Sequence, residues 1–204
     1  MTTGTARPDV SRETLDRLEI FAGLLEKWNP RINLVARSTL ADLWTRHIQD
    51  SLQVMRCVDG EIDHWADFGS GGGFPGLIVA ICAKELGYPH RVTLVESDTR
   101  KATFLRTVLR EADVAGHVIP ERIEEVAPLE ANVISARALA DLSRLFALAS
   151  PHLSDDGFCL FPKGANWRSE VQTARNSWQF TYDTIPSVTE SNAVILKIKG
   201  LSRV

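Results

Sequence analysis

Hydrophobic residues follow two different patterns along the chain, and the change comes near residue 60. Before it, apolar residues recur at the spacing of an amphipathic helix. We predict a first helix that Ser11 caps, with Glu13 in its first turn, and that Pro30 ends. A second helix is predicted from a cap at Thr39, with Asp42 three residues on. Their apolar faces are Leu18, Phe21, Ala22, Leu25 and Trp28, then Leu40, Leu43, Trp44, Ile48, Leu52 and Met55.

From Ile62 onward, short apolar runs alternate with amphipathic stretches. The predicted strands are 62–68, 92–95, 117–119, 132–136 and 157–161, followed by 180–185 and 193–198. The predicted helices are 76–86, one capped by Asp98 or Thr99, 142–149 and one near 167–177. No helix separates the last two strands, which predicts a closing antiparallel hairpin.

This order predicts an α/β, Rossmann-like fold, in which a mainly parallel sheet has helices on both faces. We expect residues 61–204 to form this domain and residues 1–60 to be a helical extension packed on it, as one structural unit. Residues 1–10 are predicted to be a loose tail.

Composition is that of an ordinary globular protein. The 204 residues are 44% hydrophobic and 24% charged, with a formal net charge of −3. The surface as a whole would therefore not attract bare nucleic acid, and any RNA contact must be local. No apolar run reaches the length of a membrane span, and the first residues lack the apolar segment of a secretion signal, so we expect a cytoplasmic protein without membrane contact. Three isolated cysteines indicate neither disulfides nor a metal site.

The stretch Asp67–Gly76 links the first predicted strand of the sheet to the first helix of the sheet. Four glycines and one serine occupy positions 69–73, so this loop is free to adopt positive φ angles and to present bare N–H groups to a ligand. Pro75 favours the first turn of a helix, which predicts a helix start near Gly76.

Two ligand classes fit this loop. Gly71-x-Gly73-x-x-Gly76 matches the dinucleotide pattern, with Glu96 twenty residues beyond it to bind a ribose. Asp67-x-Gly69-x-Gly71-x-Gly73 matches the nucleoside-binding loop of S-adenosylmethionine methyltransferases equally well, again with Glu96. A tight turn without any ligand is the third possibility. The loop by itself leaves all three open.

Charged residues follow the later strands at their carboxyl ends, where ligands of such sheets bind. Glu96, Arg122–Glu124, Arg137 and Lys163 could share one cleft with the glycine loop. Each of them alone is more often a surface charge or part of a salt bridge. For His47 we expect a hydrogen-bonded pair with Asp50 that joins two helices, rather than a catalytic role.

Six ordered motifs resemble one family. They cover most of the chain from about Phe21 to Gly164, and they are Trp28-Asn29…Asn33-Leu34, His47-Ile48…Asp50-Ser51-Leu52, Asp67–Gly76, Arg122-Ile123-Glu124-Glu125, Ala136-Arg137-Ala138 and Lys163-Gly164. They resemble the guanine-N7 methyltransferases of small-subunit ribosomal RNA, also called glucose-inhibited division protein B. The resemblance favours the methyltransferase interpretation over the dinucleotide one. It implies a class I enzyme that uses S-adenosylmethionine to methylate one guanine in the 530 loop of 16S RNA, and for which we expect a monomer.

The resemblance also implies roles for individual residues. Cofactor contacts are implied for Gly69, Gly71, Phe74, Glu96, Ile123, Glu124 and Arg137. Glu96 would bind the ribose hydroxyls, Ile123 and Glu124 would meet the adenine, and RNA contacts are implied for Arg122 and Lys163.

No catalytic side chain is assigned, because guanine N7 already carries an unprotonated lone pair and alignment should dominate. A nicotinamide-dependent reductase is the other enzyme class, but neither Tyr88 nor Tyr182 has a lysine four residues on, as its catalytic pair would need. A nucleoside-binding module that only docks on the ribosome is the non-enzymatic alternative.

Overall fold

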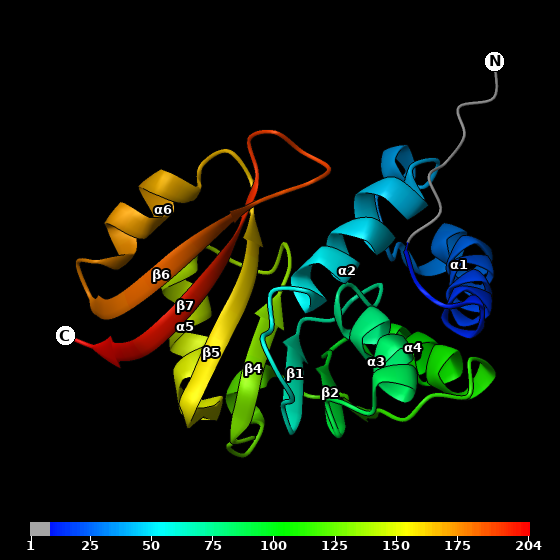
Figure 1. Cartoon of the computed structure of the whole chain (residues 1–204), viewed down its shortest axis with the longest axis horizontal. Coiled ribbons are helices and arrows are strands. Elements are labelled where there is room, and N and C mark those ends of the chain that lie inside the picture. The colour runs from blue at the N-terminus through cyan, green and yellow to red at the C-terminus, as the bar shows by residue number, and fades with distance from the viewer. Residues whose placement is uncertain (1–8) are drawn as a thin grey trace.

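A computed structural model describes residues 9–204, and residues 1–8 of the predicted tail lie outside it. Seven strands form one sheet in the order β3-β2-β1-β4-β5-β7-β6 (Figure 1). Their bounds are β1 His64–Phe68, β2 Arg91–Val95, β3 His117–Ile119, β4 Ala131–Ala136, β5 Leu153–Lys163, β6 Trp178–Pro186 and β7 Val194–Arg203. The first five strands pair in parallel, while β7 pairs antiparallel with both β5 and β6. The predicted mainly parallel sheet with a closing hairpin is confirmed.

Helices cover both faces of the sheet, which is also as predicted (Figure 1). Their bounds are α1 Arg12–Ile32, α2 Gln49–Met55, α3 Gly76–Leu86, α4 Thr99–Glu111, α5 Leu142–Ala149 and α6 Trp167–Ala174. On one face, α1, α3 and α4 bury a core around Phe21, Leu77 and Phe104. On the other, α5 and α6 pack on Phe68 and Phe161. The N-terminal helices thus share the core of the face that carries the glycine loop.

Pro30 does not end α1, contrary to the prediction. The helix continues to Ile32, and Asn33 closes it in the left-handed region (φ 51°). The side-chain oxygen of Asn29 accepts the N–H groups of Leu34 (2.7 Å) and Val35 (2.9 Å). These bonds fix the chain as it leaves the helix, and Pro30, close to that end, removes only one N–H donor from the helical pattern.

The second predicted helix is also different from the expectation. Thr39 does not cap it: Arg37–Thr39 is a 3₁₀ turn, Leu43–Ile48 is π-helical, and only Gln49–Met55 is α-helical. The Thr39 hydroxyl instead donates to the carbonyl of Ala36 (2.9 Å). The spacing of apolar residues alone could not distinguish these helix types, since one apolar face fits any of them over so short a length.

Candidate functional site

The glycine loop leaves β1 with its backbone in the conformation the sequence predicted. Gly69 (φ 60°), Gly71 (φ 51°) and Gly73 (φ 93°) all have positive φ angles, which L side chains rarely adopt. The N–H of Ser70 donates to the carbonyl of Val95 (3.1 Å), so the loop is tied to the end of β2. Helix α3 begins at Gly76, directly after Pro75, as predicted.

A cavity of about 410 Å³ opens over this loop, and we call it the glycine-loop cleft. It lies at the carboxyl ends of β1, β2 and β4, where sheets of this type bind ligands. Its lining comprises Gly69, Gly71, Val95, Glu96, Ser97, Lys101, Glu121, Arg122, Ile123, Glu124, Ala138, Leu139, Ala140, Arg144 and Leu148. Its volume falls within the range of about 300–1,000 Å³ that small-molecule sites occupy.

Glu96 is the carboxylate of this cleft, and its position is fixed. One oxygen, Oε2, accepts the N–H of Gly71 (2.8 Å), and the other, Oε1, accepts the N–H of Asp98 (2.8 Å). The residue is only 8% exposed. Each oxygen keeps a lone pair for a further donor, so the carboxylate can accept a pair of hydroxyl groups on a ligand. Glu96 and the bare backbone of Gly71 together fit the predicted nucleoside.

Ile123 and Glu124 also line the cleft, from the short 3₁₀ turn Ile123–Glu125. Ile123 is buried and gives the cleft an apolar surface, while Glu124 forms an ion pair with Arg144. Arg122 is exposed and also lines the glycine-loop cleft. An apolar side chain beside carboxylates suits an adenine, whose faces are apolar and whose amino group donates hydrogen bonds.

Phe74 and Arg137 pack against each other, and neither lines the glycine-loop cleft, although cofactor contacts were implied for both; Arg137 lines a second cavity, described below. The Arg137 guanidinium carbon is 4.9 Å from the centre of the Phe74 ring, and the ring of His47 stacks on Phe74 at 5.1 Å. Phe74 is 5% exposed, so its ring is covered by these neighbours. A cation over an aromatic face is stabilised most when both are shielded from water.

His47 does not pair with Asp50, so that prediction is wrong. Its Nδ1 lies 2.8 Å from a guanidinium nitrogen of Arg137, and its Nε2 lies 2.9 Å from the hydroxyl oxygen of Thr39. Because Thr39 already donates to Ala36, Nε2 carries the proton and Nδ1 accepts from Arg137. Burial, together with the charges of Arg137 and Arg46, lowers the pKa of His47 to about 4. The neutral imidazole thus holds Arg137 in place.

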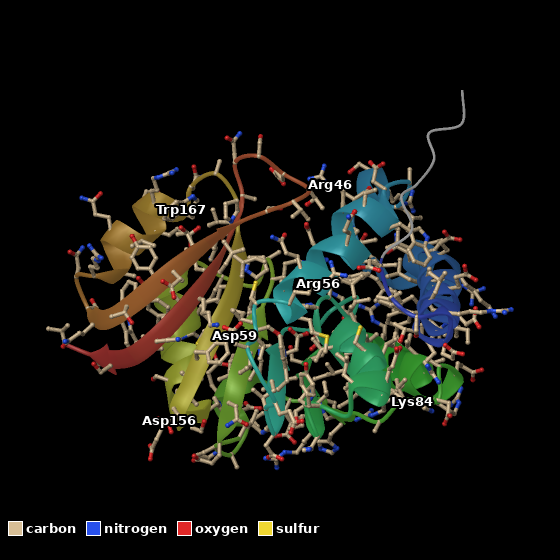
Figure 2. The ribbon with its side chains drawn as sticks, in the orientation of Figure 1. Arg46, Arg56, Asp59, Lys84, Asp156 and Trp167 are labelled. Atoms are coloured by element: carbon tan, nitrogen blue, oxygen red, sulfur yellow. The ribbon has the colours of Figure 1, made fainter. Side chains whose placement is uncertain are left out.

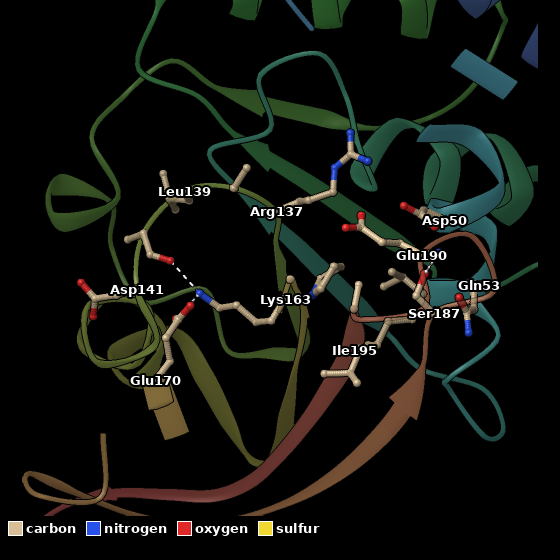
Figure 3. Close-up of a pocket in the computed structure, with 17 residues that line it drawn as sticks. Asp50, Gln53, Arg137, Leu139, Asp141, Lys163, Glu170, Ser187, Glu190 and Ile195 are labelled. Atoms are coloured by element: carbon tan, nitrogen blue, oxygen red, sulfur yellow. Dashed lines mark hydrogen bonds and ion pairs between the residues drawn. The ribbon is translucent and has the colours of Figure 1, made fainter. Parts of the chain in front are cut away.

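A second cavity, of about 560 Å³, lies beyond the segment that follows β4 (Figure 3). We call it the hairpin pocket, because the loop between β6 and β7 forms part of its wall. Its lining comprises Asp50, Gln53, Val54, Arg137, Ala138, Leu139, Ala140, Asp141, Pro162, Lys163, Gly164, Glu170, Ser187, Glu190, Ala193, Val194 and Ile195. Three residues, Ala138, Leu139 and Ala140, line both cavities and so form a shared wall.

Lys163 is held at this wall by two bonds. Its Nζ donates to the carbonyl of Ala140 (2.8 Å) and to the carboxylate of Glu170 (2.7 Å). The same Glu170 oxygen accepts the N–H of Leu142 at the start of α5 (2.9 Å). Arg122 and Lys163 therefore line different cavities, although the sequence suggested one cleft for both.

Sequence reasoning missed the far side of the hairpin pocket. Gln53 of α2 binds the carbonyl of Pro186 (2.7 Å) and the N–H of Val188 (3.0 Å). Arg46 pairs with Glu190 (3.3 Å), beside the loop between β6 and β7 (Figure 2). Local sequence patterns do not predict contacts between segments more than 130 residues apart. Leu139 was also missed, although its place just after β4 was a usable signal.

The described residues, 9–204, contain no group of three or more His, Cys, Asp or Glu side chains placed to hold a metal ion. Over the same residues, no helix combines the length and the apolar character that spanning a bilayer requires.

Comparisons with known proteins identify the family and the fold. Residues 14–198 match the GidB family, described as rRNA small subunit methyltransferase G. The ribosomal RNA small subunit methyltransferase G of Ruegeria pomeroyi is 55% identical over 196 residues, which cover 96% of each chain. Among solved structures, a TehB-like SAM-dependent methyltransferase from Corynebacterium glutamicum aligns with a TM-score of 0.59 at 14% identity, covering 87% of this chain and 98% of that one. The fold is that of the class I methyltransferases, and the chain belongs to the GidB family of small-subunit rRNA methyltransferases.

Proposed function

We propose that this protein transfers a methyl group from S-adenosylmethionine to N7 of a guanine in the 530 loop of 16S ribosomal RNA. The observation that carries the proposal is the pair of cavities that share the wall Ala138–Ala140. One cavity has the backbone and carboxylate for a nucleoside, and the other has room for a base. We further propose that the enzyme acts as a monomer in the cytoplasm, on the RNA within a small ribosomal subunit.

In the glycine-loop cleft, Gly69 and Gly71 would line the methionine end of the donor, and Glu96 would bind the ribose hydroxyls. Ile123 and Glu124 would contact the adenine. Phe74 and Arg137 are proposed to lie near the methionine end of the donor without lining the cleft: Phe74 directly follows the glycine loop, and Arg137 packs against its ring. When bound, S-adenosylmethionine supplies an electrophilic methyl group on a sulfonium.

Alignment is the main task left to the protein. Guanine N7 presents a free lone pair, so no side chain needs to remove a proton before the methyl group moves. Holding the two reactants in line contributes on the order of 7–11 kcal/mol in well-oriented systems. The shared wall suits this task because hydrogen bonds hold it in place. Lys163 donates to the Ala140 carbonyl, and Glu170 accepts from both Lys163 and the N–H of Leu142 at the start of α5.

A methyl-transfer assay tests the proposed function directly. Purified protein with tritiated S-adenosylmethionine is given either small subunits that lack the mark or protein-free 16S RNA, and the label is identified after nuclease digestion. We expect label in N7-methylguanosine from the 530 loop. Label in any other nucleoside, or none in either substrate, would refute the proposal, and the better substrate shows whether assembled protein is needed.

Lys163→Ala is expected to lower kcat/KM for RNA by about tenfold or more, with little change in the affinity for S-adenosylmethionine, because the proposed cofactor contacts come from Gly69, Gly71, Glu96, Ile123 and Glu124 and not from the shared wall. The reason is that Lys163 is proposed to hold RNA phosphate at the hairpin pocket, and a hydrogen bond to a charged group contributes about 1.5–3 kcal/mol. Methylation kinetics and calorimetry measure the two effects. Lys197→Ala is the matched control, since Lys197 is similarly covered but pairs with Asp59 outside both cavities. A large loss of cofactor affinity in Lys163→Ala would overturn the assignment.

A further inference from the structure

The hairpin pocket has chemically different sides. Figure 3 shows Leu139 of the shared wall on one side and Asp50, Gln53 and Glu190 on the opposite side. The first side borders the glycine-loop cleft. A base in the pocket would therefore turn its reacting edge toward the wall and its other edge toward α2, the helix that carries Asp50.

Asp50 has unused hydrogen-bonding capacity on this side. Its Oδ1 accepts the hydroxyl of Thr189, and its Oδ2 has no hydrogen-bond partner among residues 9–204. The side chain is half-buried, so a ligand that met it would find it partly shielded from water. The positive charge of Arg137 acts on the carboxylate from within the same pocket.

Anchoring the loop between β6 and β7 does not by itself explain why a carboxylate is found at position 50. Gln53, one turn further along α2, already binds the loop through both its side-chain nitrogen and its side-chain oxygen. Arg46 adds an ion pair to Glu190. The loop thus has anchors on either side of Asp50.

Guanine offers what this carboxylate lacks. Its N7 and O6 acceptors lie on one edge, while N1–H and the 2-amino group are two adjacent donors on the other edge. With N7 toward the shared wall, both donors face α2. Adenine has an acceptor at N1 instead, which a carboxylate would repel. We propose that Asp50 accepts hydrogen bonds from N1–H and the 2-amino group of the target base and thereby selects guanine; this rests on the proposed function and deepens it.

The same contact would favour the reaction as well as the choice of base. Transfer of a methyl cation to N7 forms an N–C bond and breaks a C–S bond, so the purine gains a positive charge and the sulfonium becomes a neutral thioether. A carboxylate beside the purine interacts more strongly with the charged product-like state than with neutral guanine. Interactions that strengthen along the reaction raise kcat and not only affinity.

The test compares guanosine with inosine, which lacks only the 2-amino group of the base, at the target position of the RNA. We expect wild-type kcat/KM to be about tenfold lower for inosine, as loss of good base contacts produces. Asp50→Ala removes both acceptor oxygens, so it should lower kcat/KM for guanine by a similar factor or more and should methylate both bases at nearly equal rates. Any intrinsic difference in N7 reactivity cancels when the guanine-to-inosine ratio of kcat/KM for the wild type is divided by the same ratio for the variant.

Thr189→Val is the matched control, because it removes the hydroxyl that binds Asp50 but keeps the carboxylate. It should retain the guanine preference. Thermal unfolding of each variant identifies any loss of folded protein. A guanine preference that persists in Asp50→Ala would overturn the proposal, as would its loss in Thr189→Val. Failure of the wild-type enzyme to methylate the guanine RNA would instead refute the proposed function.

Discussion

Replacing Glu96 with alanine is expected to lower the affinity for S-adenosylmethionine by about 100-fold or more. The carboxylate would lose its proposed bonds to two ribose hydroxyls, and each bond to a charged group contributes about 1.5–3 kcal/mol. The variant also frees the N–H groups of Gly71 and Asp98, which Glu96 now accepts. The loop would then be less well ordered before the ligand binds, which adds to the loss. Isothermal titration calorimetry measures the change directly.

Glu96→Gln separates the two contributions. Glutamine keeps one acceptor oxygen and the shape of the side chain, so we expect an affinity between those of the wild type and Glu96→Ala. Glu121→Ala is the control, since Glu121 lines the same cleft but has no bond to the glycine loop among the described residues. Cofactor affinity in Glu96→Ala within twofold of the wild type would show that Glu96 does not bind the ribose.

The elements predicted best from the sequence are those whose ends are marked by local capping residues, prolines or glycines. Helix α3 has its predicted bounds because Pro75 precedes it and Gly87, in the left-handed region, follows it. Asp98 caps α4 by accepting the N–H groups of Arg100 and Lys101, one of the two caps expected. Strand β5 was predicted too short, because its start at Leu153 is followed by the polar residues Ser154–Asp156, which do not read as a buried strand.

The candidate site was predictable only where it follows strands in sequence. Glu96, Ile123 and the glycine loop come together because parallel strands place their carboxyl ends at one edge of the sheet. The hairpin pocket depends instead on α2 and the loop between β6 and β7, which meet through contacts such as Gln53 to Pro186. The π-helical turn that carries His47 likewise depends on a distant partner, Arg137. Such pairings are tertiary facts, with no local signal.

Asp67 is expected to make the protein less stable as the pH rises from 4 to 7, by about 3 kcal/mol relative to Asp67→Asn. It is 0% exposed, and burial raises its pKa from 3.8 to about 6. The hydroxyl of Ser135 donates to its Oδ1 (2.6 Å), and Arg137 attracts the anion, but both oppose the shift only in part. Its Oδ2 lies beside the start of α3 without a well-formed hydrogen bond.

The sign follows from proton binding. Between pH 4 and pH 6 the folded protein keeps the proton that the unfolded chain has released, so each rise in pH favours unfolding. Below pH 4 both states are protonated, and above pH 7 both are ionised, so the effect is confined to this window. Urea unfolding of the wild type and Asp67→Asn between pH 4 and pH 7 gives the difference, in which the contributions of the histidines cancel.

Ser135→Ala provides the control for this buried carboxylate. It removes a hydrogen bond that lowers the pKa of Asp67, so the pH-dependent loss of stability should extend to higher pH than in the wild type. Parallel stability profiles for the wild type and Asp67→Asn would show that Asp67 has an ordinary pKa. The expected result would instead mean that the ionised carboxylate of Asp67, at the start of the glycine loop, makes the folded protein less stable. Its Oδ2 lies against Gly76, where an added Cβ would come within 2.6 Å of it. At this position the close packing of loop, strand and helix would then outweigh the penalty of a buried charge.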